Sequence, residues 1–164
     1  FIGTGYLFNI VPIQVVYIIL VCTITEILLN KTKFGRSLYA TGGNPVAASF
    51  SGINTKRVIF TVYVFSSLMA AIAGVCLASR MYSGTSTSGQ SAEMDAIAAV
   101  VLGGTSMTGG IGNLFGVIIG VLLIAILSNG LNLLGIDSSW QLVVKGIVII
   151  IAVLLDFFKK KREI

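Results

Sequence analysis

Four long apolar runs, separated by short polar segments, set the pattern of this chain. They cover residues 11–29, 58–79, 114–134 and 140–158, and each is close to the length of about 20 residues that a helix needs to cross the hydrocarbon core of a membrane. A helix is the expected form, because backbone groups in hydrocarbon find hydrogen-bond partners only within their own segment. The pattern therefore predicts an all-α fold, a polytopic transmembrane helix bundle.

The composition agrees with a membrane protein. Of the 164 residues, 55% are hydrophobic and 10% are charged, with a mean hydropathy of +0.99, whereas about a quarter of the residues of a soluble domain are charged. The chain begins with Phe1 and shows no signal sequence, so we expect it to start inside a longer protein. Cys22 and Cys76 lie in separate predicted spans without His or further Cys, so we expect two packing residues and no metal site.

The positive charges gather at two places. Of the eleven Lys and Arg residues, nine form two clusters: Lys31, Lys33, Arg36, Lys56 and Arg57 around the segment 40–57, and Lys159, Lys160, Lys161 and Arg162 at the end. Short loops rich in Lys and Arg stay on the cytoplasmic side, so we expect both clusters, and the C-terminus, to be cytoplasmic. Because the charges flank apolar runs, we expect contact with membrane lipid and no nucleic acid as a partner.

This orientation requires a fifth crossing. Two cytoplasmic clusters demand an even number of crossings between residues 57 and 159, and only three long apolar runs lie there. The remaining candidate is 91–110, whose apolar core runs from Ala96 to Leu102 before Gly, Ser and Thr take over. Non-helical backbone at membrane depth is tolerated where protein or a watery cavity surrounds it, so we expect a broken crossing beside a pathway. A re-entrant or external loop is the alternative, with one cluster on the other side.

Glycines predict close helix packing at the start of the third long run. Gly112, Gly116 and Gly120 recur every four residues, which gives a smooth stripe where another helix can approach closely. The sequence has no GxxxxGK[ST] motif, so we expect this chain to bind no nucleotide by a P-loop.

The segment ATGGNPVAASFSGINTKR, residues 40–57, is polar and carries helix-capping signals. Asn44 suits an N-cap, Pro45 the first helical position, and Gly52 the left-handed residue after a helix end, which predicts a helix over 45–51. A helix this short is unstable alone in water, so something must hold it. The residues leave two interpretations open: a device that docks on another protein, and an interfacial helix held against anionic lipid by Lys56 and Arg57.

The residues also carry a resemblance to a known family. The runs GRSLYATGGNPVAASFSGINTKR, EMDAIAAVVLGGTSMTGGIGNLFG, SNGLNLLGI and WQLVVKGIVIIIAVLLD closely resemble permease subunits of bacterial ABC importers for ribose, xylose, galactose and related monosaccharides. The resemblance covers almost the whole chain and corresponds to the C-terminal half of such a permease. It implies one permease domain over 1–164, with a cytoplasmic coupling loop at 30–57. The docking role on the ATPase subunit then falls on a GGNPxAAxxSGI pattern: Asn44, Pro45, Ala47, Ala48, Ser49, Gly52 and Ile53.

The resemblance further implies a function and its partners. The chain is expected to form a sugar translocation path in the bacterial inner membrane and to perform no covalent chemistry. ATP is bound by a separate ATPase subunit and the chain itself needs no cofactor. The other implied partners are a periplasmic or lipid-anchored sugar-binding protein and a second permease subunit. An ion-driven secondary transporter, with a substrate site at discontinuous helices, and a membrane scaffold without transport are the alternatives.

Polar residues near the expected outer face are candidates for the path: Asp95, Asn129, Asn132 and Gln141. Each either faces the sugar or satisfies the backbone of a broken helix. Lys145 lies five residues inside the last run, where an unpaired charge costs about 2.5–3.5 kcal/mol on insertion scales. We therefore expect Lys145 to snorkel outward or to face an interior partner, Asp137 or Asp95.

Overall fold

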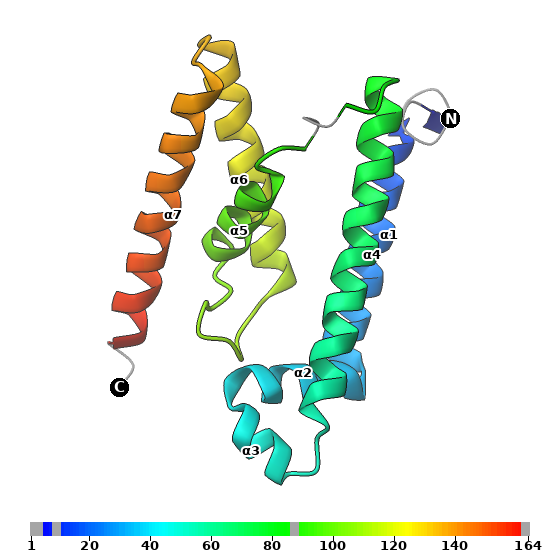
Figure 1. Cartoon of the computed structure of the whole chain (residues 1–164), viewed down its shortest axis with the longest axis vertical. Coiled ribbons are helices and arrows are strands. Elements are labelled where there is room, and N and C mark those ends of the chain that lie inside the picture. The colour runs from blue at the N-terminus through cyan, green and yellow to red at the C-terminus, as the bar shows by residue number, and fades with distance from the viewer. Residues whose placement is uncertain (1–4, 8–10, 86–88, 162–164) are drawn as a thin grey trace. The chain divides into compact units, whose positions relative to one another are not determined.

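The computed structural model describes residues 5–7, 11–85 and 89–161. Contacts within the chain divide it into two units, Phe1–Gln90 and Ser91–Ile164, and each is described by itself (Figure 1). The first unit holds β1 (Tyr6–Leu7), β2 (Val11–Pro12), α1 (Ile13–Lys31), α2 (Lys33–Gly43), α3 (Pro45–Phe50) and α4 (Thr55–Met81). The second holds α5 (Ala92–Leu102), α6 (Leu114–Leu133) and α7 (Ser138–Lys161).

The predicted all-α fold is confirmed, with one small addition. Helices α1, α4 and α6 are long and apolar enough to cross a membrane, and the described apolar part of α7, Ser138–Leu154, forms a shorter stretch. The addition is a hairpin of two short antiparallel strands, in which Tyr6 pairs with Pro12 and Leu7 with Val11. The long helices thus match the four apolar runs of the sequence.

In the first unit, α1 and α4 run beside each other, and α2 and α3 lie at the end where α1 stops and α4 begins (Figure 1). Helix α2 packs against α1, α3 and α4. The sequence predicted a loop over 30–57 with one short helix, so α2 is a difference. Thr32 caps α2 by accepting a hydrogen bond from Gly35 N at 3.3 Å, and Gly35 is buried against the backbone of Leu28 and Leu29. A side chain at position 35 would prevent this tight corner.

In the second unit, α5 packs against both α6 and α7 (Figure 1). The core consists of three buried residues, Ala98, Ala99 and Ile124, and three partly buried ones that pack against them, Leu102, Val148 and Ile149. All three helices contribute to it. The short helix α5 therefore supplies the residues that hold two longer helices in one unit.

Helices α5 and α6 touch through their backbones. A Cβ atom built on Gly103 would lie 2.6 Å from the carbonyl oxygen of Gly116, and one built on Gly120 would overlap the carbonyl oxygen of Ala99. Gly116 and Gly120 thus confirm the predicted close approach, and the partner is α5. Gly112 instead faces the Thr105 side chain, 3.3 Å from a Cβ atom built there. We call the Ala99–Gly120 and Gly103–Gly116 contacts the glycine seam.

The contacts of the glycine seam show which residues of α5 and α6 lie at the same level. Ala99 lies level with Gly120 and Gly103 with Gly116, so the two helices are antiparallel and one turn forward on α5 matches one turn back on α6. One turn further back on α5, Asp95 is level with Ile124. Because α6 covers Leu114–Leu133, Asp95 lies near the middle of a membrane-spanning helix.

The predicted break in 91–110 is confirmed. Helix α5 has 11 residues, which gives a length of about 16 Å against a hydrocarbon core of about 30 Å. After Leu102 the backbone is non-helical up to the start of α6, and Gly104, Gly109 and Gly110 in this stretch have φ values of +80°, +88° and +78°. The helix alone is therefore too short to cross a bilayer.

A methyl group added within the glycine seam should destabilise the protein, whereas one added elsewhere on α6 should not. In the complete permease, Gly120→Ala should lower the free energy of unfolding by about 1–3 kcal/mol, because overpacking here pushes on backbone that has no rotamer to change. Gly130→Ala, in the same helix with no atom within 4 Å of the new Cβ, is the control and should be neutral or slightly stabilising. Thermal unfolding in detergent measures both variants. Equal midpoints for the two variants would contradict the glycine seam.

Candidate functional site

Helix α3 is short and well capped at both ends. The Asn44 side chain accepts hydrogen bonds from Val46 N at 3.1 Å and from Ala47 N at 3.0 Å, which satisfies two of the free donors at the helix start. Pro45 occupies the first turn, and Gly52 has a φ of +83°, in the left-handed region that favours glycine at helix ends. The predicted helix over 45–51 is confirmed and ends one residue earlier, at Phe50.

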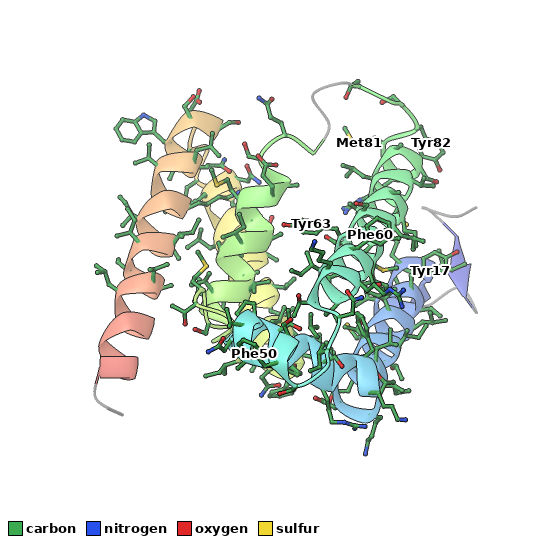
Figure 2. All side chains as sticks on the ribbon, turned by 60° about the horizontal axis from the view of Figure 1, so that its bottom comes forward. Tyr17, Phe50, Phe60, Tyr63, Met81 and Tyr82 are labelled. Atoms are coloured by element: carbon green, nitrogen blue, oxygen red, sulfur yellow. The ribbon has the colours of Figure 1, made fainter. Side chains whose placement is uncertain are left out.

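The two faces of α3 differ. Ala48 is buried, with 4% of its surface exposed, and holds the helix against its own unit. Phe50 is 89% exposed and Val46 64% exposed; Figure 2 shows Phe50 at the surface of the first unit. Of the residues expected to dock, Pro45, Ala47, Ser49 and Gly52 are exposed, and Ile53 is half-buried. The exposed apolar side chains leave α3 with an uncovered face.

The end of the first unit that carries α3 is also strongly basic. Five basic residues are exposed there, on α1, α2 and the first turn of α4: Lys31, Lys33, Arg36, Lys56 and Arg57. Exposed Lys and Arg beside membrane helices attract anionic headgroups. The charges agree with contact to lipid, whereas the apolar face of α3 agrees with contact to protein.

An ion pair joins α5 to α7. Lys145 Nζ lies 2.7 Å from Asp95 Oδ1 and 2.9 Å from Asp95 Oδ2, so the ammonium engages both carboxylate oxygens. The Lys145 side chain is 11% exposed and that of Asp95 37%. The sequence named Asp137 and Asp95 as possible partners of Lys145, and the structure selects Asp95. Asp137 instead accepts a hydrogen bond from Ser139 N at 2.9 Å and so caps α7.

The other candidate path residues have different roles. Gln141 donates hydrogen bonds to Asn132 Oδ1 at 2.8 Å and to the carbonyl of Ile136 at 2.9 Å, so Gln141 and Asn132 tie the corner between α6 and α7. Asn129 is exposed. Sequence reasoning missed Ser128, whose hydroxyl oxygen is buried without a hydrogen-bond partner among the described residues. No pattern around Ser128 singles out that burial.

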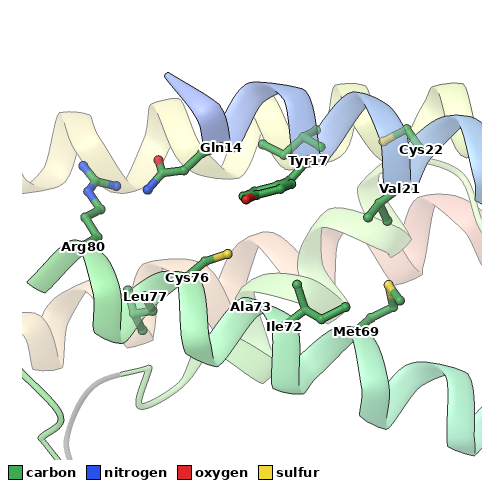
Figure 3. A pocket seen from close by; sticks show the side chains of 11 residues that line it. Gln14, Tyr17, Val21, Cys22, Met69, Ile72, Ala73, Cys76, Leu77 and Arg80 are labelled. Carbon is green, nitrogen blue, oxygen red and sulfur yellow. The ribbon is translucent and has the colours of Figure 1, made fainter. Parts of the chain in front are cut away.

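A groove of about 420 Å³ lies between α1 and α4 (Figure 3). Its walls are mostly apolar, and Arg80 lies at one end near Gln14. Cys22 and Cys76 line it from opposite helices, both as free thiols. Within the described part of the chain, no group of three or more His, Cys, Asp or Glu residues is placed to hold a metal ion.

Comparisons with known proteins relate the chain to transport permeases. A family model described as "Branched-chain amino acid transport system / permease component" matches residues 1–153. The chain is 54% identical to the ribose import permease protein RbsC of Bacillus subtilis, over 94% of this chain and 48% of that protein. It is 42% identical to the xylose transport system permease protein XylH of Haemophilus influenzae, over 98% of this chain and 44% of that protein.

These matches cover only part of each relative. The chain spans about half the length of the curated relatives it matches. No solved structure matches it.

The cap of α3 can be tested directly. Asn44→Ala should destabilise the helix by about 1 kcal/mol, since two backbone donors lose their acceptor. The amides of Ala48, Ser51 and Ile53, which are bonded within this turn, should then exchange with deuterium about fivefold faster. Asn44→Asp keeps the acceptor and should retain protection. Unchanged exchange over 45–53 in Asn44→Ala would show that the side-chain bonds do not hold the helix.

Proposed function

We propose that this chain, which belongs to the family described as branched-chain amino acid transport system / permease component, forms part of the translocation path of an ATP-driven importer for monosaccharides. Support for the sugar class comes from the relatives, which are named for ribose import and xylose transport. The observation on which the proposal chiefly rests is the exposed apolar face of α3. A capped helix with 89% of Phe50 uncovered is suited to docking on a partner.

We assign the docking contact to the ATPase subunit of the importer. Burying an exposed Phe side chain stabilises a complex by about 1.5–3 kcal/mol, and Ala47 beside it leaves room for a partner surface. The buried Ala48 and the half-buried Ile53 then anchor α3 to its own unit rather than contact the partner. Lys56 and Arg57 hold the same end of the unit at anionic headgroups.

The link from α3 to α4 supplies a lever. Only residues 51–54 separate the two helices, and Asn54 caps α4 by accepting a hydrogen bond from Arg57 N at 3.1 Å. With 27 residues, α4 is about 40 Å long. A displacement of α3 by ATP-driven closure of the partner therefore passes into a helix that reaches across the membrane. Sugar moves because the inward and outward states differ in their affinity for it.

We place part of the proposed path beside Asp95, near the middle of α6. A charge near the middle of a membrane marks a pathway or a functional contact, and Asp95 stays partly exposed within its unit. We include the exposed Asn129 as a second polar contact for sugar hydroxyls. Asn132 and Gln141, which bond to each other, serve to shape the corner above.

The proposed importer contains further subunits. The chain carries out no covalent chemistry and needs no cofactor of its own, since the ATPase subunit binds and hydrolyses ATP. A periplasmic or lipid-anchored binding protein delivers the sugar, and a second permease subunit completes the path. The chain lies in the bacterial inner membrane with its C-terminus in the cytoplasm, in agreement with the basic residues beside α2.

A charge placed on the exposed face of α3 tests the docking role. Ala47→Glu should lower uptake of ribose and xylose into proteoliposomes by about tenfold or more, because a carboxylate buried in an apolar interface lacks a partner. The helix itself should persist, since a negative charge in the first turn suits the helix dipole. The assay uses the complete permease with its ATPase subunit and binding protein, and measures uptake and ATP hydrolysis together.

Ala40→Glu is the matched control. Ala40 is also an exposed alanine, in α2, and its replacement should leave uptake near the wild-type rate. Equal losses in both variants would remove the docking role from α3. Uptake that runs on an ion gradient without ATP would replace the proposal by an ion-driven carrier.

A further inference from the structure

Helix α5 has little within its own segment to fix its position along the membrane normal. The residue before it, the N-cap Ser91, makes no capping hydrogen bond with its side chain and has a φ of +67°. The backbone beyond Leu102 is a glycine-rich, non-helical stretch. A helix of 11 residues with irregular backbone after it cannot be held in place by its own length, so the neighbouring helices must fix its level.

The contact with α6 is close but smooth. The glycine seam brings together backbone atoms of Ala99, Gly103, Gly116 and Gly120, and the larger side chain of Ile124 packs beside the seam in the core. Small residues permit close packing and strong dispersion contacts. They resist separation of the helices better than they resist sliding along the axis, because a smooth surface presents similar contacts one turn away.

The contact with α7 is specific for one register. Asp95 and Lys145 are 50 residues apart in sequence and meet at 2.7 and 2.9 Å. The next turn of each helix, with Ala98 on α5 and Val148 and Ile149 on α7, packs in the same core, so α5 and α7 run parallel. A slip of one turn would separate the charges by about 5.4 Å and leave both unpaired in a medium of low dielectric constant.

We propose that the Asp95–Lys145 ion pair positions α5 by setting its depth between α6 and α7, and that transport requires α5 to be held at this depth. Buried ion pairs are seldom more stable than an apolar pair of similar volume, so stability alone does not explain two charges here. Their directional contact explains them, because it distinguishes one register of a smooth helix from the next. The inference about transport rests on the proposed function; the inference about register does not.

Cross-linking measures the register without any transported solute. In the complete permease, with Cys22 and Cys76 replaced by Ser, the pair Ala98→Cys and Ile149→Cys reports the native register. The pair Ala98→Cys and Val153→Cys reports a shift of one turn along α7. We expect the first pair to form a disulfide and the second to remain reduced. With Asp95→Leu and Lys145→Met added, the shifted pair should also cross-link, to within about threefold of the native pair.

A transport assay, read beside a stability measurement, distinguishes a positioning role of the ion pair from a stabilising one. The apolar double variant Asp95→Leu/Lys145→Met should be as stable in detergent as the wild type or more so. Its uptake of ribose and xylose should nevertheless fall by about tenfold or more, because α5 no longer keeps one depth. Lys145→Arg preserves the charge contact and should keep most of the uptake rate.

A charge exchange guards against a variant that fails to fold. Asp95→Lys/Lys145→Asp restores the pair in reverse, and it should recover the native cross-link. Recovery will be incomplete because Lys in the first turn of α5 opposes the helix dipole. The proposal is overturned if the apolar double variant cross-links only in the native register, or if it transports at the wild-type rate. It is equally overturned if the exchanged pair assembles but cross-links only in the shifted register.

Discussion

A helix too short to cross a bilayer must be held at membrane depth by its neighbours, and the second unit is arranged around that constraint. Helix α5 meets α6 through backbone contacts that only glycine and alanine permit, and meets α7 through Asp95 and Lys145. The first contact excludes lipid from the backbone and the second gives the helix a register. Without them, the non-helical stretch after Leu102 would expose unpaired peptide groups to hydrocarbon, at a cost of several kcal/mol each.

Much of this arrangement was predictable from residue patterns. Apolar length predicted the long helices, the four-residue spacing of Gly116 and Gly120 predicted a close approach, and Asn44, Pro45 and Gly52 predicted α3. Helix α2 was not predicted, because its three glycines and mean polarity resemble a loop, and its stability comes from contacts with α1, α3 and α4. The choice of Asp95 over Asp137 depends on how distant helices pack, which spacing along one chain does not encode. The burial of Ser128 is hidden for the same reason.

The two units contribute different properties to a proposed importer. The first places a short, capped helix with an apolar face directly before the long helix α4, among basic side chains suited to an anionic membrane surface. The second holds a broken element near the middle of α6, where irregular backbone is tolerated beside protein or water. The chain belongs to a permease family and is similar to ribose and xylose permeases, and the proposed function relates both features to transport. In the proposed importer, the ATPase subunit moves α3, and a wall that contains α5 faces the solute.

The most direct test of this view is a contact measurement at Phe50, the most exposed side chain of α3. Phe50→Cys, in the complete permease without Cys22 and Cys76, carries a short photoactivatable cross-linker in native membranes that contain the ATPase subunit. We predict a cross-linked product of permease and ATPase subunit, and labelling of the same cysteine only from the cytoplasmic side. Labelling from outside, or cross-links to lipid alone while the ATPase subunit is bound elsewhere, would contradict the coupling role of α3.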